Sequence, residues 1–182
     1  MKTKTKSKLF KPAHSKSAQR EQEALEGIEK VLLELSGNGE ESPDSFLIIV
    51  EGKKDALSLR NLGAAAEIYP CANQPAAAFC EQIAETKKKA IILTDWDRKG
   101  RILASRFIRH FQNLGAPYDE TYREKLLMYT KKDIKDVESL YSHVVKLRQK
   151  FQSALEDEYE DFGDAEENFI DVIDVEKEAA GG

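Results

Sequence analysis

The sequence has few cysteines, few prolines and no long apolar run. Cys71 and Cys80 are the only cysteines among 182 residues, and their spacing matches no zinc or redox motif. We therefore expect two free thiols in a reducing compartment rather than a disulfide framework. No segment reaches the roughly 18 apolar residues of a membrane helix, and the basic N-terminus lacks the apolar region of a secretory signal. These absences predict a cytoplasmic protein with no membrane partner.

Charge is distributed unevenly along the chain. The formal net charge is −5, yet residues 1–20 contain seven basic residues and no acid, whereas residues 153–182 contain twelve acids and one base. This composition predicts a disordered basic arm over residues 1–16 and a disordered acidic tail over residues 153–182. The arm would attract a polyanion such as nucleic acid, and the tail offers a segment that a protein partner could bind.

The order of apolar patterns indicates an α/β fold. Residues 17–36 have apolar positions at helical spacing, and the region from 44 to 152 then alternates between strand and helix patterns. Such alternation predicts right-handed crossovers and a roughly four-stranded parallel sheet, Rossmann-like, with helices on both faces. The expected strands are 46–50, 67–69, 90–94 and 126–129, and the expected helices are 53–62, 75–85, 100–114 and 136–151.

Acidic residues follow two of the expected strands directly. The run Phe46–Val50 leads into Glu51, and the run Ala90–Thr94 leads into Asp95 and Asp97. Because ligands of such sheets bind at the carboxyl ends of the strands, these side chains are expected at one edge. Carboxylates about 4 Å apart repel one another by about 4 kcal/mol per pair at an effective dielectric near 20. A divalent metal would relieve that repulsion, and this points toward phosphate chemistry.

Other metal and catalytic motifs do not fit. An EF-hand loop starting at Asp95 would need Asp or Asn at Lys99 and Glu at Arg106, and a dehalogenase-type phosphatase would need Thr at Lys99. No Ser-His-Asp or Cys-His arrangement is legible, and we interpret His110 and His143 as surface or packing residues.

The two acidic motifs resemble the signatures of the Toprim domain. Glu51-Gly-Lys-Lys-Asp55 is similar to its Glu-Gly-x-x-Asp motif, and Asp95-Trp-Asp97-Arg-Lys-Gly100 to its Asp-x-Asp-x-x-Gly motif. The resemblance covers roughly residues 44–140, and the whole chain looks most like small stand-alone Toprim proteins of archaeal type. It implies that Glu51 is a general acid or base that can also bind metal, and that Asp95 and Asp97 coordinate Mg²⁺. Lys99 stands where some family members have a third acid. The number of metal ions, one or two, is therefore left open.

We expect a second group of charged residues to complete the site. Asp136 and Glu138 follow the expected fourth strand, where they either cap a helix or supply a further ligand. The cations beside the acids are candidates for phosphate contacts, although basic residues at a helix start also oppose the helix dipole. These candidate cations are Arg98, Lys99, Arg101 and Lys135.

These features predict Mg²⁺-dependent phosphodiester chemistry on RNA or DNA, with Mn²⁺ as a substitute ion. The expected enzyme is a nuclease or another phosphoryl-transfer enzyme, because no tyrosine-bearing topoisomerase domain or primase module is visible. The alternative is a non-catalytic Toprim module that binds RNA, DNA or a protein. The sequence alone leaves both open.

Overall fold

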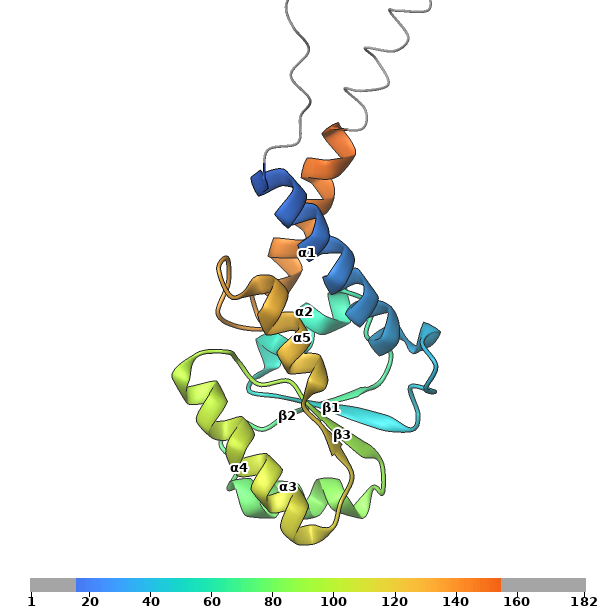
Figure 1. Cartoon of the computed structure of the whole chain (residues 1–182). Coiled ribbons are helices and arrows are strands. Elements are labelled where there is room, and N and C mark those ends of the chain that lie inside the picture. Colours follow the sequence, from blue (N-terminus) through green and yellow to red (C-terminus); the bar gives the residue numbers. More distant parts are fainter. Residues whose placement is uncertain (1–15, 155–182) are drawn as a thin grey trace, which may run out of the picture.

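The computed structural model describes residues 16–154 (Figure 1). Apart from Lys16 and residues 153–154, the predicted basic arm and acidic tail lie outside the described residues. The described part of the chain begins with α1 (Lys16–Leu33), continues into a short π-helical turn, η1 (Glu34–Asn38), and kinks at Gly37, where φ is +80°. The predicted N-terminal helix is therefore present, and a left-handed glycine redirects the chain toward the sheet.

The sheet has four parallel strands in the order β2-β1-β3-β4. Its strands are β1 (Phe46–Val50), β2 (Glu67–Pro70), β3 (Lys89–Ile92) and β4 (Tyr118–Asp119). The helices that connect them are α2 (Lys53–Asn61), α3 (Ala76–Glu85) and α4 (Arg98–Leu114). The last strand is followed by α5 (Thr121–Thr130), a loop, and a helix over residues 140–154. The predicted four-stranded parallel α/β sheet is confirmed.

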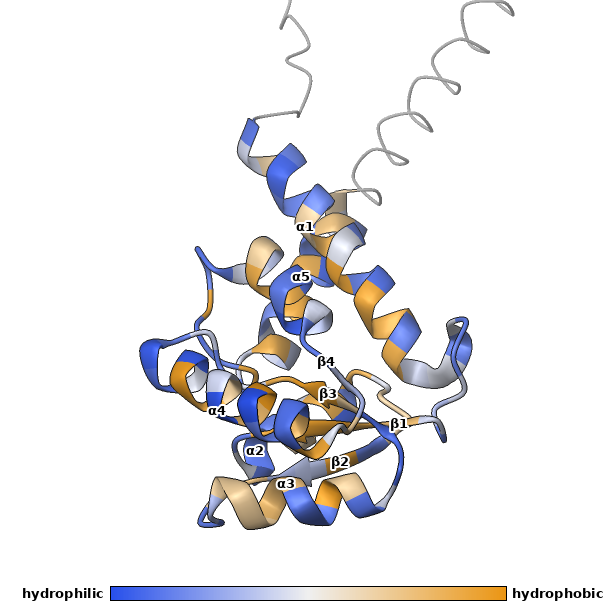
Figure 2. Cartoon of the chain, turned by 60° about the horizontal axis from the view of Figure 1, so that its bottom comes forward, coloured by the Kyte–Doolittle hydropathy of each residue, from blue (hydrophilic) through white to orange (hydrophobic). Residues whose placement is uncertain are grey.

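Alternation along the central strands produces two apolar cores, one on each face of the sheet. Ile48 and Ile91 point into the core that α1, α2, α5 and the C-terminal helix cover, whereas Ile49 and Ile92 point into the core that α3 and α4 cover. Figure 1 shows these two layers of helices on opposite sides of the strands, and Figure 2 shows the hydrophobic strands β1 and β3 between helices that also carry many hydrophilic residues. Strands buried on both faces explain the continuous apolar runs in the sequence.

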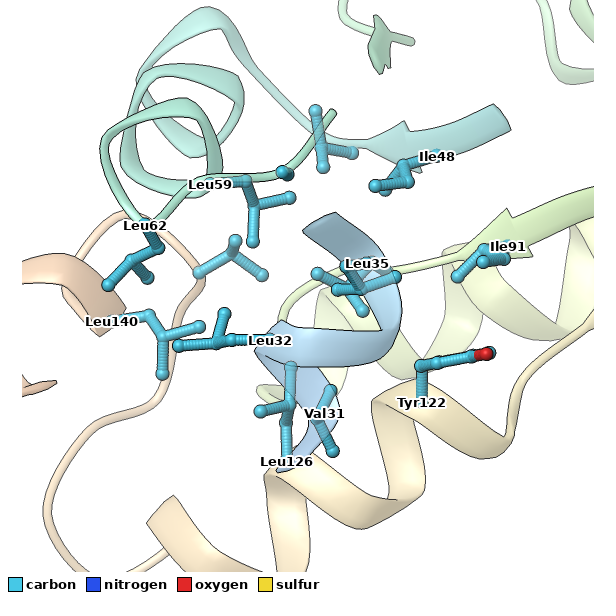
Figure 3. Close-up of a cluster of buried hydrophobic side chains, with 14 of the residues drawn as sticks. Val31, Leu32, Leu35, Ile48, Leu59, Leu62, Ile91, Tyr122, Leu126 and Leu140 are labelled. Carbon is cyan, nitrogen blue, oxygen red and sulfur yellow. The ribbon is translucent and has the colours of Figure 1, made fainter. Parts of the chain in front are cut away.

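The larger core joins the N-terminal helix to the helices that follow the sheet. Figure 3 shows Leu32 of α1 and Leu35 of η1 meeting Leu59 of α2, Leu126 of α5 and Leu140 of the C-terminal helix. Gly27 permits this packing, because a Cβ at that position would collide with the ring of Tyr129. The same layer carries ion pairs on its surface, among them Arg148 with Glu29.

The predicted fourth strand at 126–129 is wrong. Leu126, Leu127, Met128 and Tyr129 belong to helix α5, and the fourth strand is the two-residue β4 that follows Pro117. Tyr122 and Leu126 are buried one turn apart against α1, so the residues preceding the apolar run complete a helical pattern. Packing of α5 on α1 therefore decided the conformation of a run too short to distinguish helix from strand.

Two further expectations concern cysteine and membrane segments. Cys71 and Cys80 are both buried and free, as the sequence predicted. Burial raises the pKa of Cys71 to about 11 and that of Cys80 to about 12. Among the helices of residues 16–154, none has the length and apolar character needed to cross a membrane.

Candidate metal and phosphate site

Two loops and the end of β1 converge at the carboxyl edge of the sheet. Glu51 follows β1, and residues 94–97 join β3 to α4. The loop between α5 and the C-terminal helix closes over them: the backbone N–H of Trp96 donates to the carbonyl of Lys135 at 3.2 Å, and its indole Nε1 donates to the carbonyl of Ile134 at 3.1 Å. Trp96 therefore fixes this loop against the acidic motif.

Asp95 links all three segments through its backbone and its carboxylate. Its N–H donates to Oε1 of Glu51 at 3.1 Å, and its Oδ1 accepts the N–H of Val137 at 2.9 Å. These bonds span 44 and 42 residues of sequence, so they depend on the folded sheet. The structure thus brings Glu51 and Asp95 together, as the order of strands predicted.

Asp97 has a different local role, because it caps helix α4. Its Oδ1 accepts the N–H of Gly100 at 2.7 Å, an N-cap bond that fixes the first turn of the helix. Gly100 lies against the site: a Cβ there would be 2.7 Å from Oε1 of Glu51 and closer still to the carbonyl of Asp95. The glycine of the second motif therefore permits the acidic loop to pack on the helix start.

A buried arginine that the sequence analysis did not single out holds the loop at residues 94–97 through hydrogen bonds to its backbone. Arg123 of α5 is only 8% exposed; its Nε donates to the carbonyl of Thr94 at 3.0 Å and its Nη2 to the carbonyl of Asp95 at 2.7 Å. Desolvation lowers the pKa of Arg123. Its charge also lowers the pKa of Glu51, although burial and the neighbouring acids outweigh this effect.

Burial and mutual repulsion make it costly to ionise the two central acids. Desolvation, followed by the charges of Asp55, Glu51 and Asp136, raises the pKa of Asp95 to about 7, against the bond from Val137. Desolvation, with the charges of Asp97 and Asp55, also raises the pKa of Glu51. A cation bound here would favour both ionised forms.

Asp55 is a second residue whose contribution the sequence analysis missed. It is buried in the first turn of α2, and its Oδ2 accepts the N–H of Gly52 at 2.7 Å. Desolvation, together with the charges of Glu138 and Asp136, raises its pKa. It was visible as the last residue of the first motif, and its place three residues after Gly52 was the signal that would have found it.

The structure gives Asp136 and Glu138 mainly structural contacts. Oδ1 of Asp136 accepts the N–H of Ser139 at 2.8 Å, which caps the turn before the helix at 140–154. The predicted helix therefore begins later than Asp136, and neither acid follows a strand. Glu138 pairs with Lys54 of α2 at 2.9 Å, with both side chains exposed. Asp136 is near enough to raise the pKa of Asp95, while Glu138 acts on Asp55.

The predicted phosphate-contact cations lie at the start of α4, directly after Asp97, and in the covering loop. Arg98, Lys99 and Arg101 occupy the first turn of α4, and Lys135 lies in the loop bonded to Trp96. All four side chains are exposed, and none forms an ion pair with an acid of residues 16–154. Their charges are therefore available to an external anion.

Comparison with known proteins identifies the family. The Toprim domain matches residues 46–128, which include both acidic motifs. A UPF0292 protein of Methanosarcina acetivorans is 47% identical over 126 residues, which make up 69% of this chain and 85% of that protein. The chain belongs to the UPF0292 family and carries a Toprim domain. The resemblance to small archaeal Toprim proteins is thus confirmed.

Other matches extend the UPF0292 relationship. A UPF0292 protein of Methanocaldococcus jannaschii is 37% identical, and the alignment covers 70% of this chain and 97% of that protein. A UPF0292 protein of Pyrococcus abyssi is 41% identical over 57% of this chain and 78% of its own length. A solved protein from Aquifex aeolicus has 20% identity and a TM-score of 0.48, with 65% of this chain and 95% of that chain aligned.

The donor set of this UPF0292 Toprim domain suits a hard cation. Within residues 16–154, no group of three or more His, Cys, Asp or Glu side chains is already arranged to hold a metal ion. Glu51, Asp95 and Asp97 each accept a backbone N–H through one oxygen, and no hydrogen bond within the described residues engages the other. Carboxylate oxygens are the ligands that Mg²⁺ takes in proteins. The three acids are therefore candidate ligands by their chemistry.

Proposed function

We propose that this UPF0292 protein binds one or two Mg²⁺ ions at Glu51, Asp95 and Asp97 and hydrolyses phosphodiester bonds of nucleic acid. The observation that carries the proposal is the Glu51–Asp95 junction, where two acids with raised pKa values meet at a strand edge without a partner cation in direct contact. Such an arrangement costs folding free energy unless a ligand offsets it. The Toprim match, whose domains typically bind divalent metals, supports the same reading.

Each acid has a separate task in this proposal. Asp95 and Asp97 would hold the metal, which supplies Lewis-acid stabilisation of phosphoryl oxygens when bound. Glu51, whose pKa is raised, would carry a proton to or from the water or hydroxyl at the reacting phosphate. Arg123 positions the loop by its two bonds to carbonyl oxygens and leaves the carboxylates free for ligands.

Phosphate binding is assigned to the cations at the start of α4. Arg98, Lys99 and Arg101 lie within four residues of Asp97, and basic residues in a first helical turn oppose the helix dipole. Their position is unfavourable for the helix alone and favourable for an anion held beside the acids. Lys135, in the covering loop, is assigned the same role.

The second candidate function is a non-catalytic nucleic-acid module. It is favoured by Lys99, which replaces the third acid of some Toprim sites, and by the absence of a preformed three-ligand group in the described residues. It would retain the cationic start of α4 but would not cleave. RNA and DNA are both possible ligands in either case.

The test is a cleavage assay with the full-length protein. End-labelled RNA and DNA are incubated with Mg²⁺, Mn²⁺ or EDTA, and Asp95→Asn is compared with Asp44→Asn, the same substitution at an exposed position before β1. We expect metal-dependent cleavage that Asp95→Asn reduces at least about 100-fold and Asp44→Asn leaves intact. Cleavage that survives Asp95→Asn would remove the proposed mechanism, and binding without cleavage would favour the module.

A further inference from the structure

Helix α4 is the most cationic element of the described chain. Its 17 residues include five Lys or Arg side chains and no Asp or Glu, although the protein as a whole carries a net charge of −5. The first three cations belong to the site proposed above. Arg106 and Arg109 lie two and three turns further along the helix, where no carboxylate of the site needs them.

All five cations lie on the solvent side of α4. At about 100° per residue they fall within an arc of about 160°, opposite the buried Ala104, Phe107 and Phe111. Exposed Ile102 lies in the same arc and is 45% exposed. The helix is therefore divided into an apolar side that packs on the sheet and a cationic side that faces solvent. We call this cationic face the α4 face, made up of Arg98, Lys99, Arg101, Ile102, Arg106 and Arg109.

The α4 face is not neutralised by neighbouring acids. None of its five cations forms an ion pair with an acid in the part of the chain that the structure describes. Elsewhere exposed cations do find such partners, as Lys54 does with Glu138 and Arg148 with Glu29. Five uncompensated charges on one helix repel one another, so the face gains stability when an extended polyanion covers it.

The charged residues near Asp95 differ in sign from one element to another. The start of α4, three residues after Asp95, carries the cations described above, whereas Asp55 of α2 and Asp136 of the covering loop are acids whose charges raise the pKa of Asp95. Lys54, which lies in the first turn of α2 with Asp55, is already paired with Glu138. A polyanion that reaches Asp95 is therefore attracted by the cations of α4 and repelled by Asp55 and Asp136.

We propose that the α4 face is the track along which a nucleic-acid strand runs from the carboxylate site. From Arg98 to Arg109 the helix rises about 16 Å, which corresponds to about five nucleotides at about 3.4 Å per nucleotide of a stacked strand. The partner is thus an extended strand rather than a mononucleotide or a short phosphate ligand. Ile102 supplies apolar surface for sugars or bases among the phosphate contacts. The inference rests on the proposed nucleic-acid function and adds where the strand lies.

The test measures how affinity depends on salt for the double variant Arg106→Gln/Arg109→Gln. A fluorescent single strand of about 20 nucleotides, as DNA and as RNA, is titrated with full-length protein in EDTA at several salt concentrations. The slope of log K against log salt is negative, and each lost phosphate contact reduces its magnitude by about 0.7. We therefore expect the slope to become shallower by about 1.4 and the affinity at low salt to fall roughly ten- to hundredfold. A thermal melt confirms that the variant is folded.

The matched control removes the same charge from the opposite face of the sheet. Arg20→Gln/Lys30→Gln changes two exposed cations of α1, and we expect its slope to match that of the unmodified protein. An unchanged slope for the α4 variant, or an equal loss in the α1 control, would overturn the track. If the unmodified protein binds neither strand in EDTA and cleaves neither in Mg²⁺, the proposed function fails together with the track; if it cleaves without binding in EDTA, or if the α4 variant binds as well as the unmodified protein, only the track fails.

Discussion

Gly100 approaches the carbonyl oxygen of Asp95 so closely that the helix start and the acidic loop leave no room for a side-chain carbon between them. A Cβ at this position would also lie 2.7 Å from Oε1 of Glu51. The glycine that ends the second motif is thus required by packing, because the space that a Cβ would take is already filled by the Asp95 carbonyl and the Glu51 carboxylate. Both residues are proposed to bind metal.

Substitution Gly100→Ala should therefore damage stability and the site together. Neither the Asp95 carbonyl nor Glu51 can move without breaking the bonds that hold them, so we expect a loss of about 1 to 3 kcal/mol in the free energy of unfolding, measured by urea denaturation. The control is Gly52→Ala, whose Cβ would meet nothing closer than Oδ2 of Asp55 at 3.6 Å. It should cost less than about 1 kcal/mol. Equal losses in both variants would contradict the packing argument.

Arg123→Met should destabilise the protein more than its place in an unremarkable helix suggests. The change removes the donors to the carbonyls of Thr94 and Asp95 and leaves these acceptors without that partner, at a cost of about 2 to 3 kcal/mol. Arg60→Met is the matched control, because the exposed Arg60 also donates to a backbone carbonyl, that of Ala64, at 2.9 Å. It should cost under about 1 kcal/mol, and a similar loss for both arginines would show that burial of Arg123 is irrelevant.

Asp95→Asn should stabilise the metal-free protein at alkaline pH. The unfolded Asp95 ionises near 3.8 and the folded one near 7, so the free energy of unfolding falls as pH rises through that window and stays reduced above it. Asparagine keeps an acceptor for Val137 without the charge. After discounting for partial solvent exposure, we expect a gain of about 1 to 2 kcal/mol at pH 8, about 2 to 8 °C in Tm, and little gain near pH 4.

Adding Mg²⁺ provides the second half of the Asp95 measurement. Mg²⁺ should raise the Tm of the unmodified protein at pH 8 and leave that of Asp95→Asn nearly unchanged, because a ligand stabilises the folded state only if that state binds it. Asp44→Asn, tested in parallel, should respond as the unmodified protein does. If Asp95→Asn is less stable than the unmodified protein at pH 8 without metal, the ionised Asp95 does not destabilise the metal-free fold and the argument fails.

His143 predicts a separate loss of stability at acidic pH. Its Nε2 is buried and has no hydrogen-bond partner within residues 16–154, and burial lowers its pKa, with Lys146 acting in the same direction and Asp133 and Glu21 against it. The unfolded chain binds the proton first, so stability present above pH 6.5 declines as pH falls below it. His143→Gln should flatten the decline in Tm between about pH 7 and pH 5. If His143→Gln leaves the dependence of Tm on pH unchanged, His143 is not the cause of the acid-induced loss of stability.

Much of this architecture was predictable because it depends on local rules. The apolar runs at 46–50 and 90–94, buried on both faces, predicted central parallel strands, and β1 and β3 are adjacent in the sheet. Since parallel strands end at one edge, the meeting of Glu51 with Asp95 followed from topology. Gly100 and Asp97 also belong to a local motif, a helix start with its N-cap.

The remainder depends on contacts that no short pattern contains. By itself, the apolar run Leu126–Tyr129 is compatible with either a strand or a helix. Only its packing against α1 favours the helix. The bonds of Arg123 to Thr94 and Asp95 cross almost thirty residues. Asp95 accepts the N–H of Val137, which lies 42 residues further along the chain. The covering loop therefore reaches this edge of the sheet, as expected, although the strand expected before it is a helix.

Anomalous scattering from crystals soaked in Mn²⁺ is the measurement that most directly tests the central claim, that this edge of the sheet is a metal site. The account predicts one or two Mn²⁺ peaks bound by oxygens of Asp95 and Asp97, with Glu51 as a ligand or neighbour, and loss of the peaks in Asp95→Asn crystals. Crystals that diffract well but carry no anomalous peak at this edge, or carry Mn²⁺ only at Asp136 and Glu138, would contradict it.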